Sequence, residues 1–194
     1  MAPPAPPLMT AHEYYRTPET VKPAELAFGV LRVADAPSAY HQSIVIELFR
    51  ALDGHVRSRQ LGRMWLAPLD VVLSESRAVI VQPDLFFVAH DQDGIVKERV
   101  YGAPELVIEV LSPHPRVGSI DERIGWFARF GVRECWLVHA AEVELSIMRF
   151  ANQRIDERIR LRRDEPVRSR ALPEFAPTLE EILLNVGQPF PFSK

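Results

Sequence analysis

The chain has 194 residues and a mass of 22.1 kDa, which suits one domain rather than several. Its 47% hydrophobic and 25% charged content is ordinary for a globular protein, and no apolar run approaches the roughly 18 residues of a membrane-spanning helix. The net charge of −3 gives no global sign of nucleic-acid binding, although a basic groove can lie on an acidic protein, and the single cysteine, Cys135, excludes an internal disulfide and fits a reducing cytoplasm.

The N-terminal part of the chain predicts a leader, a short helix and a hairpin. Residues 1–9 are rich in proline and predict a flexible leader without the basic and apolar regions of a signal peptide. Thr10 is a candidate N-cap for a short helix over AHEYY. Residues 25–36 are apolar but interrupted by Gly29, which favours a short strand or hairpin.

A longer helix is predicted from Ser38, its N-cap, to about Arg59. Its apolar positions recur at helical spacing and should pack on a sheet. His41 lies on the same face, one turn earlier. That face consists of Val45, Leu48, Leu52 and Val56.

From Trp65 the apolar pattern changes to the short period of β-strands. We expect strands within WLAPLDVVL, AVIVQPDLFFV, LVIEVLS and ECWLVHA, an antiparallel pair from VELSIMRF and RIDERIRLRR, a helix over residues 121–130 ended by Gly131, and a last helix capped by Thr178. Neither an internal repeat nor a linker divides residues 10–194. The pattern predicts a single domain of mixed α/β (α+β) class, with a mixed sheet flanked by helices.

Two acidic residues lie in strongly apolar surroundings. Asp84 precedes LFFV and follows Pro83, while Glu109 lies in the middle of LVIEVL. Removing an unpaired carboxylate from water costs several kcal/mol, so each needs a partner. For Glu109 one interpretation is a structural salt bridge to an arginine. The other is a cation shared with Asp84, because two buried acids on neighbouring strands repel each other unless a cation lies between them.

A PD dipeptide followed by a second acid in an apolar strand resembles the core of the PD-(D/E)XK nucleases. More narrowly, the whole chain resembles the Uma2 family within that superfamily, and GAPELVIEVLSP is the most specific of the matching segments. The other matching features are the HEYYRTPE helix, Glu25 before a glycine-containing hairpin, His41 at the start of a helix, Gln82-Pro83-Asp84, the helix that ends in FGV, the strand ECWLV, and LPEFAPTLEEIL.

This resemblance implies a restriction-endonuclease-like core with Mg²⁺ or Mn²⁺ held by Asp84 and Glu109, and with the backbone carbonyl of Val110 as a further ligand. The family usually has a lysine in the following helix, and the matching position here is Arg123. The family's acidic residue early in that helix is also displaced, so that Ser119 or Asp121 would have to replace it.

The arginine at position 123 bears directly on catalysis. Its guanidinium can neutralise charge and bind phosphate, but its pKa above about 12 excludes it as a general base. Only three of the 23 basic residues are lysines, and Lys97, in an expected hairpin before the Glu109 strand, is the one that could take over the role. Water bound to a metal ion ionises more easily even without a base, so that weak activity remains compatible with the sequence.

Other candidates have two interpretations each. His41 is either a core histidine or a residue at the site entrance, and Glu47 is either a solvated helix residue or a further site acid. Ser112, before Pro113 and His114, has no hydrolase elbow around it. The run RIDERIRLRRDEPVRSR either follows a nucleic-acid backbone or forms a solvated edge hairpin.

From these observations we expect a metal-dependent endonuclease that hydrolyses DNA in the cytoplasm. The alternative is a catalytically weakened relative that binds nucleic acid or a protein partner through the same cleft. A homodimer would suit the cutting of two strands. The sequence leaves open the choice between DNA and RNA and any sequence preference.

Overall fold

The computed structural model describes residues 7–18, 22–111 and 120–187. The helices are α1 (Ala11–Tyr15), α2 (Ala39–Ser58), the 3₁₀ helix η1 (His90–Ile95), α3 (Ile120–Phe130) and α4 (Leu179–Ile182). The strands are β1 (Ala24–Ala27), β2 (Val30–Val33), β3 (Gly62–Leu66), β4 (Val71–Ser74), β5 (Val79–Val81), β6 (Leu85–Ala89), β7 (Val100–Tyr101), β8 (Leu106–Leu111), β9 (Glu134–His139), β10 (Glu144–Ala151) and β11 (Arg154–Leu161).

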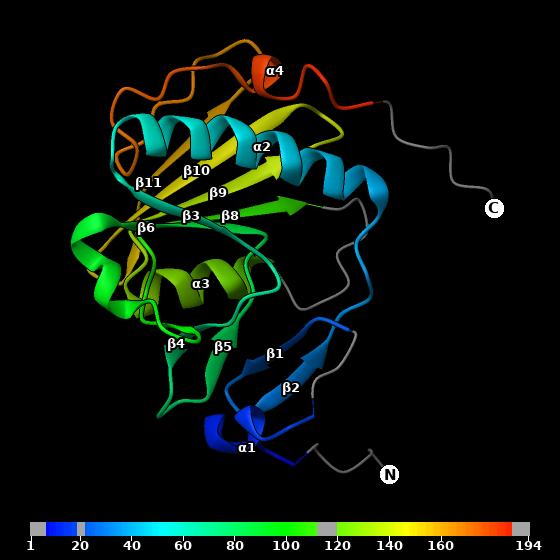
Figure 1. Ribbon diagram of the computed structural model, residues 1–194, viewed down its shortest axis with the longest axis vertical. Coiled ribbons are helices and arrows are strands. Elements are labelled where there is room, and N and C mark those ends of the chain that lie inside the picture. The colour runs from blue at the N-terminus through cyan, green and yellow to red at the C-terminus, as the bar shows by residue number, and fades with distance from the viewer. Residues whose placement is uncertain (1–6, 19–21, 112–119, 188–194) are drawn as a thin grey trace, which may run out of the picture.

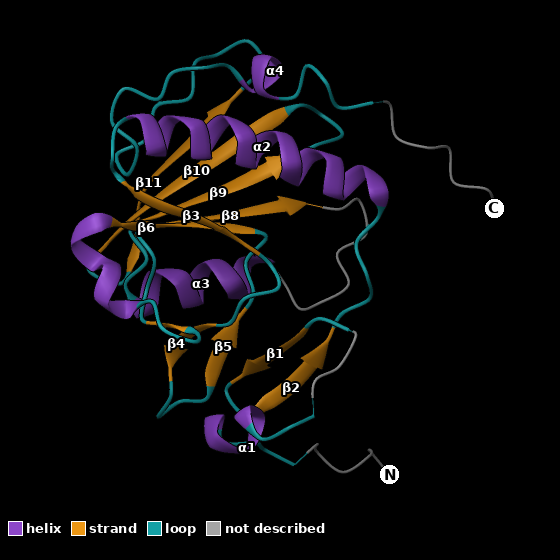
Figure 2. Ribbon diagram, in the orientation of Figure 1, coloured by secondary structure: helices purple, strands orange, loops and turns teal. Residues whose placement is uncertain are grey.

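The strands form two sheets, which Figure 2 shows in orange. A five-stranded sheet has the order β2-β1-β5-β4-β7, and a six-stranded sheet has the order β11-β10-β9-β8-β6-β3. Strands β8 and β9 are parallel, and α3 connects them as the crossover of a βαβ unit. The other pairs of the six-stranded sheet are antiparallel. Helix α2 covers one face of this sheet, while α3 and the smaller sheet lie on its other side (Figure 1).

Helix α2 packs on the sheet through the side chains that its periodicity predicts. Val45, Leu48, Leu52 and Val56 are buried together with Ile44, in one core cluster with residues of β6, β8 and β9. Burial of each such side chain stabilises the fold by roughly 1.5–3 kcal/mol. At the N-terminus of the helix, the Ser38 hydroxyl oxygen accepts the backbone N–H of His41 at 3.1 Å, which fixes the turn that carries His41.

Helix α3 packs on the opposite face of the six-stranded sheet. Ile124, Trp126 and Phe127 are buried against residues of β6, β8 and β9 and of the smaller sheet. The helix ends at Phe130, and Gly131 follows with a φ of +98°, a conformation that favours glycine. The two larger core clusters therefore lie on opposite faces of the six-stranded sheet, and a third cluster packs α1 on the smaller sheet.

The mixed α/β class predicted from the sequence is confirmed. Thr10 and Thr178 cap α1 and α4 through capping boxes, β1 and β2 form a hairpin, and β11 is the edge strand of an antiparallel pair with β10. Within the described ranges, no helix combines the length and hydropathy needed to cross a membrane. The expectations for Ser112, Pro113, His114 and Ser119, and most of the leader, concern residues outside these ranges.

Candidate functional site

The candidate site lies where the chain leaves one sheet and enters the other. Strand β5 belongs to the five-stranded sheet and β6 to the six-stranded sheet, and Gln82, Pro83 and Asp84 connect them. Pro83 has no N–H to donate to a neighbouring strand, so the ladder between β6 and β8 ends here. The strands separate at this point, and polar side chains take over the hydrogen bonds that the ladder no longer provides.

Asp84 is held by contacts on both sides of this bend. Its carboxylate oxygen Oδ2 accepts the backbone N–H of Val110 at 2.8 Å, and its backbone carbonyl accepts the N–H of Ala67 at 3.1 Å. The Nε2 atom of His41 lies 3.2 Å from the same Oδ2 atom. The carboxylate is therefore fixed between the end of β8 and the first turn of α2.

Glu109 lies in β8 and comes close to Asp84. The register pairs Leu85 with Ile108, so that its continuation by one residue would place Asp84 opposite Glu109 on the same face of the sheet. Glu109 is 8% exposed. Burial, with a smaller effect from the negative charge of Asp84, raises the pKa of its carboxyl group from 4.5 to about 7 against the opposing effect of Arg123. Such an increase in pKa is expected where two carboxylates lie close together, because like charges disfavour ionisation.

Arg123 supplies the cation that balances the buried acids. From the first turns of α3, its Nε and Nη2 atoms donate to Oε1 of Glu109 at 3.1 and 2.6 Å, and its Nη1 atom donates to Oε2 of Glu25. Arg123 is 7% exposed, and burial opposes its charge, but the two carboxylates hold the pKa of Arg123 above its usual value. Arg123 thus reaches Glu109, and the second carboxylate that it contacts is Glu25.

Glu25 is a member of this cluster that sequence reasoning did not place in the site. It lies in β1, is 9% exposed, and its Oε1 atom accepts the backbone N–H of Gln82 at 2.6 Å. Glu25 therefore joins Arg123 to the bend at Gln82, on the opposite side of that bend from Asp84. The available signal was weak, because Glu25 precedes an apolar hairpin but its partners are 57 and 98 residues away.

His41 lies at the edge of the cluster, with a side chain that is 15% exposed. Burial disfavours the charged imidazole, yet the hydrogen bond and charge of Asp84, with smaller effects from Val110 and Glu109, raise the pKa of His41. Its Nδ1 atom is buried and has no hydrogen-bond partner among the described residues. His41 is therefore mostly buried, as expected for a core histidine, and it also contacts Asp84, as expected for a residue at the entrance of the site.

The remaining expected site residues lie elsewhere or keep other partners. Glu47, on α2, pairs with Arg50. Asp121 is exposed in the first turn of α3. Lys97 is exposed and its Nζ atom lies 5.7 Å from the centre of the Tyr101 ring. Of the lysines, none has a contact with the Asp84 cluster within the described part of the chain.

A divalent ion at this cluster would need oxygen donors from the surrounding side chains. Within residues 7–18, 22–111 and 120–187, no group of three or more His, Cys, Asp and Glu side chains forms a ready metal site. Mg²⁺, however, commonly binds through one or two carboxylates and completes its shell with water and phosphate oxygens. Asp84 and Glu109 fit that requirement, provided that the Oε1 atom of Glu109 remains with Arg123 and Oε2 serves as the ligand.

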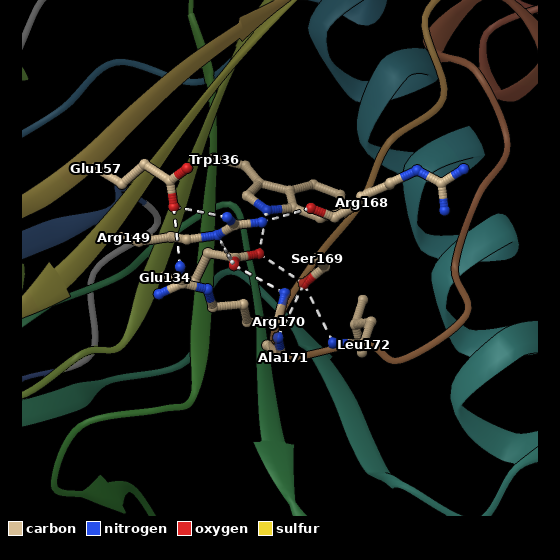
Figure 3. A network of polar contacts seen from close by, with 9 residues as sticks. All are labelled: Glu134, Trp136, Arg149, Glu157, Arg168, Ser169, Arg170, Ala171 and Leu172. Atoms are coloured by element: carbon tan, nitrogen blue, oxygen red, sulfur yellow. Dashed lines mark hydrogen bonds and ion pairs between the residues drawn. The ribbon is translucent and has the colours of Figure 1, made fainter.

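A second buried glutamate, Glu134, was also missed, and it forms a different kind of network (Figure 3). It is 1% exposed at the start of β9. Its Oε1 atom accepts from Trp136 Nε1 at 2.8 Å and from the Ser169 hydroxyl at 2.6 Å. Its Oε2 atom accepts from Arg149 Nε at 3.2 Å and from the Arg170 backbone N–H at 3.0 Å. This network fastens the segment around Ser169 to the sheet.

Comparisons with known proteins show the family and the fold of the chain. Residues 11–186 match the family model Uma2, described as "Putative restriction endonuclease". Among solved structures, the chain is similar to a crystal structure of "a putative nuclease belonging to DUF820 from Anabaena variabilis ATCC 29413", with a TM-score of 0.77 and 18% sequence identity. The similarity covers 91% of this chain and 98% of that chain, and at this identity it shows the fold alone. No curated protein matches the chain.

Proposed function

The chain belongs to the Uma2 family, and from this premise we propose that it is a divalent-metal-dependent endonuclease that hydrolyses DNA phosphodiester bonds. The observation that carries the proposal is the arrangement of Asp84 and Glu109. Both carboxylates lie where two sheets separate, and the charge of one raises the pKa of the other. A site that concentrates negative charge in this way is suited to a divalent cation.

In this proposal Asp84 and Glu109 hold Mg²⁺ or Mn²⁺, with the backbone carbonyl of Val110 as a further ligand. The ion would polarise the phosphodiester and lower the pKa of a bound water molecule. The Val110 N–H fixes the orientation of Asp84, and Arg123 fixes that of Glu109, so that neither carboxylate has to be ordered when the substrate binds.

Arg123 and His41 have separate roles. Arg123 keeps its charge at every relevant pH and neutralises negative charge near the reacting phosphate, but it cannot remove a proton from water. His41 contacts Asp84 Oδ2 and would accept or release a proton beside it. Among the described residues, no lysine contacts the cluster, so we expect slow hydrolysis compared with a nuclease that has a catalytic lysine.

A second candidate function is supported by the ion pairs of Arg123. Because its guanidinium pairs with both Glu109 and Glu25, the negative charge of these two buried acids is partly compensated without a metal ion. Such a protein could bind nucleic acid, or a protein partner, through the same cleft without cleaving it. In either case, a homodimer would present two sites by symmetry, and the single buried cysteine fits a cytoplasmic location.

The test is a cleavage assay on supercoiled plasmid, single-stranded circular DNA and RNA, with Mg²⁺, Mn²⁺ or EDTA. We expect cleavage of DNA only with the metal ions, and loss of cleavage in Asp84→Asn and Glu109→Gln. Asp156→Asn, at an exposed position of β11, is the matched control and should cleave like the native protein.

Calorimetry with Mn²⁺ separates the two candidate functions. The endonuclease hypothesis requires metal binding that Glu109→Gln greatly weakens. DNA binding without metal binding or cleavage would favour the second candidate function, whereas full cleavage by Asp84→Asn would show that the reaction occurs elsewhere.

A further inference from the structure

A partly exposed arginine, Arg32, lies beside the buried cluster and has no role in the function proposed above. It is directly opposite Glu25 in the β1–β2 pair, so that both side chains leave the sheet on the same face. Glu25 binds Arg123, and Arg32 binds Glu122, the residue before Arg123 in α3. Arg32 therefore occupies the next position outward from the Glu25–Arg123 pair, at the solvent side of the same contact between the hairpin and α3.

Aromatic side chains hold Arg32 in place. Its guanidinium carbon lies 5.2 Å from the centre of the Trp126 ring, within the range of a cation–π contact. Trp126 is 8% exposed, and the edge of Phe28 packs on it with 6.0 Å between ring centres. The guanidinium is thus ordered on a rigid support, which reduces the conformational entropy lost when it binds a ligand.

The ion pair between Arg32 and Glu122 is weak enough to be exchanged. The two charged atoms are 3.3 Å apart, and the side chains are 27% and 53% exposed. Solvent screens such a pair, and the contact with Glu122 uses one nitrogen of Arg32, whereas a phosphate can accept two parallel N–H donors from a guanidinium. Glu122 therefore holds the guanidinium in a position that a phosphate group could take.

We propose that Arg32, supported by Trp126, binds a backbone phosphate of the nucleic-acid substrate next to the phosphate that is cleaved. The proposal rests on the proposed function, since it takes the reacting phosphate to lie at Asp84 and Glu109. A polyanion that approaches Asp84, Glu109 and Glu25 meets three acidic side chains. Arg123 is buried and its donors are occupied by two of them, whereas Arg32 is accessible to solvent.

The test measures binding of a fluorescent oligonucleotide, as a single strand and as a duplex, by anisotropy over a range of salt concentrations. Ca²⁺ replaces Mg²⁺, and gels confirm that the oligonucleotide stays intact. Arg32→Ala should weaken binding by roughly 3- to 10-fold. It should also make the slope of log K against log[salt] less steep by about 0.9 for the duplex or about 0.7 for the single strand, as expected for one lost phosphate contact. The probe that binds more tightly, and whose slope changes in Arg32→Ala by the amount expected for it, shows whether the phosphate belongs to a duplex or to a single strand.

Glu122→Gln gives the opposite prediction. Removal of the competing carboxylate should leave Arg32 free for the phosphate and make binding tighter, whereas a merely structural ion pair would lose stability in both variants and change affinity in neither. Arg32→Lys keeps the charge without the planar fork and should bind with intermediate affinity. Arg77→Ala, at an exposed arginine between β4 and β5, is the matched control and should bind like the native protein.

The outcomes separate this inference from the proposed function. If the native protein binds the probe and Arg32→Ala has the same affinity and salt dependence, Arg32 is no phosphate contact, while the proposed nuclease activity stands. Equal weakening by Arg77→Ala would also overturn the inference, because the effect would then come from net charge. If the native protein neither binds nor cleaves any nucleic acid, both the inference and the proposed function fail.

Discussion

Glu109 and Glu134 are both buried glutamates in adjacent parallel strands, and both are bonded to an arginine, but their surroundings differ. Glu134 receives four hydrogen bonds, two on each oxygen, from Trp136, Ser169, Arg149 and the Arg170 backbone. Among the residues that the structure describes, Glu109 receives two hydrogen bonds, both from Arg123 and both on one oxygen, and it shares that arginine with Glu25. It also has Asp84 as a neighbour, whose charge raises the pKa of Glu109.

The difference separates a structural carboxylate from one that is available for binding. A buried carboxylate with all its acceptor positions filled has little to gain from another ligand. A buried carboxylate with one free oxygen, a raised pKa and a second acid nearby is stabilised by an added cation. Burial and an arginine partner therefore do not distinguish a structural carboxylate from a binding carboxylate. The distinction depends on how many further donors the carboxylate has.

The largest effect is expected when the Glu134 network is broken. Glu134→Ala removes the more buried of the two carboxylates that pair with Arg149, leaves Glu157 as its remaining ion-pair partner, and removes the acceptor for three other donors. Removal of one partner of a buried ion pair typically costs about 3–5 kcal/mol of unfolding free energy. Urea denaturation should show a lower midpoint with an unchanged m-value.

Glu144→Ala provides the control for this loss. Glu144 pairs with Arg160, whose side chain is 68% exposed, and exposed pairs contribute about 0–1 kcal/mol. Equal destabilisation by Glu134→Ala and Glu144→Ala would show that the Glu134 network is no more important than a surface ion pair.

A pH-dependent effect should come from Glu109. Because its pKa rises from 4.5 to about 7 on folding, the native state keeps a proton that the unfolded state has released. Stability in EDTA should therefore fall as the pH rises through this range, by up to roughly 3 kcal/mol at about 1.4 kcal/mol per pH unit. Glu109→Gln should remove this part of the pH dependence, as measured by urea denaturation at pH 4.5, 6 and 7.5.

Saturating Mn²⁺ sharpens this prediction, since a metal ion that binds the ionised carboxylate should restore stability at pH 7.5 in the native protein and not in Glu109→Gln. A stability profile of Glu109→Gln identical to that of the native protein would contradict the assignment of the titrating group.

Much of the fold could be predicted because its signals are local. The cap at Ser38 and the spacing of Val45, Leu48, Leu52 and Val56 determine where α2 lies and which face it buries. Gly131 marks the end of α3, and the alternation around Ser146 and Arg160 predicts the β10–β11 pair. The division of the strands into two sheets was not predictable in this way, because β5 and β6 are separated by only three residues of sequence.

Part of the candidate cluster could be expected from the sequence for the same reason. The sequence identifies Asp84 and Glu109 as candidate site residues because each lies next to or within an apolar run. Arg123 is a candidate because it matches the position of the family's lysine. Glu25 and Glu134 also adjoin apolar runs, but the sequence does not contain their partners nearby. Glu134 receives donors from 2 to 36 residues away, and such contacts are set by packing rather than by spacing.

Arg123 and Arg149 each join two glutamates, and the same substitution should affect them differently. Arg123→Lys should increase the rate of DNA cleavage, because a partly buried ammonium group can lose its proton and orient water. The gain should stay below the roughly 10²–10⁴-fold of a well-placed general base, since the pocket fits a longer side chain. Arg123→Ala should give no gain in rate.

Arg149→Lys is the matched control, because it makes the same substitution at an arginine outside the candidate site. Arg149 donates to Glu134, to Glu157 and to the carbonyl of Arg168, so its replacement should lower stability without any gain in cleavage rate. If the native protein cleaves efficiently and Arg123→Ala retains that rate, Arg123 has no part in catalysis and Lys97→Ala becomes the next variant to assay.

The smallest effect is expected from Ser169, which tests whether the Glu134 network is a set of separable bonds. Its hydroxyl donates to Glu134 and accepts the backbone N–H groups of Ala171 and Leu172, both at 3.1 Å. Ser169→Ala leaves Glu134 with three donors, so the loss should be about 1.5–3 kcal/mol, the usual value for a hydrogen bond to a charged group. Ser58→Ala, which removes an exposed bond to the His55 carbonyl, is the control and should change stability by less than about 0.5 kcal/mol. DNA cleavage should be unchanged in both variants.

A loss in Ser169→Ala as large as that in Glu134→Ala would mean that the network forms only as a whole, and that the carboxylate of Glu134 depends on every donor around it.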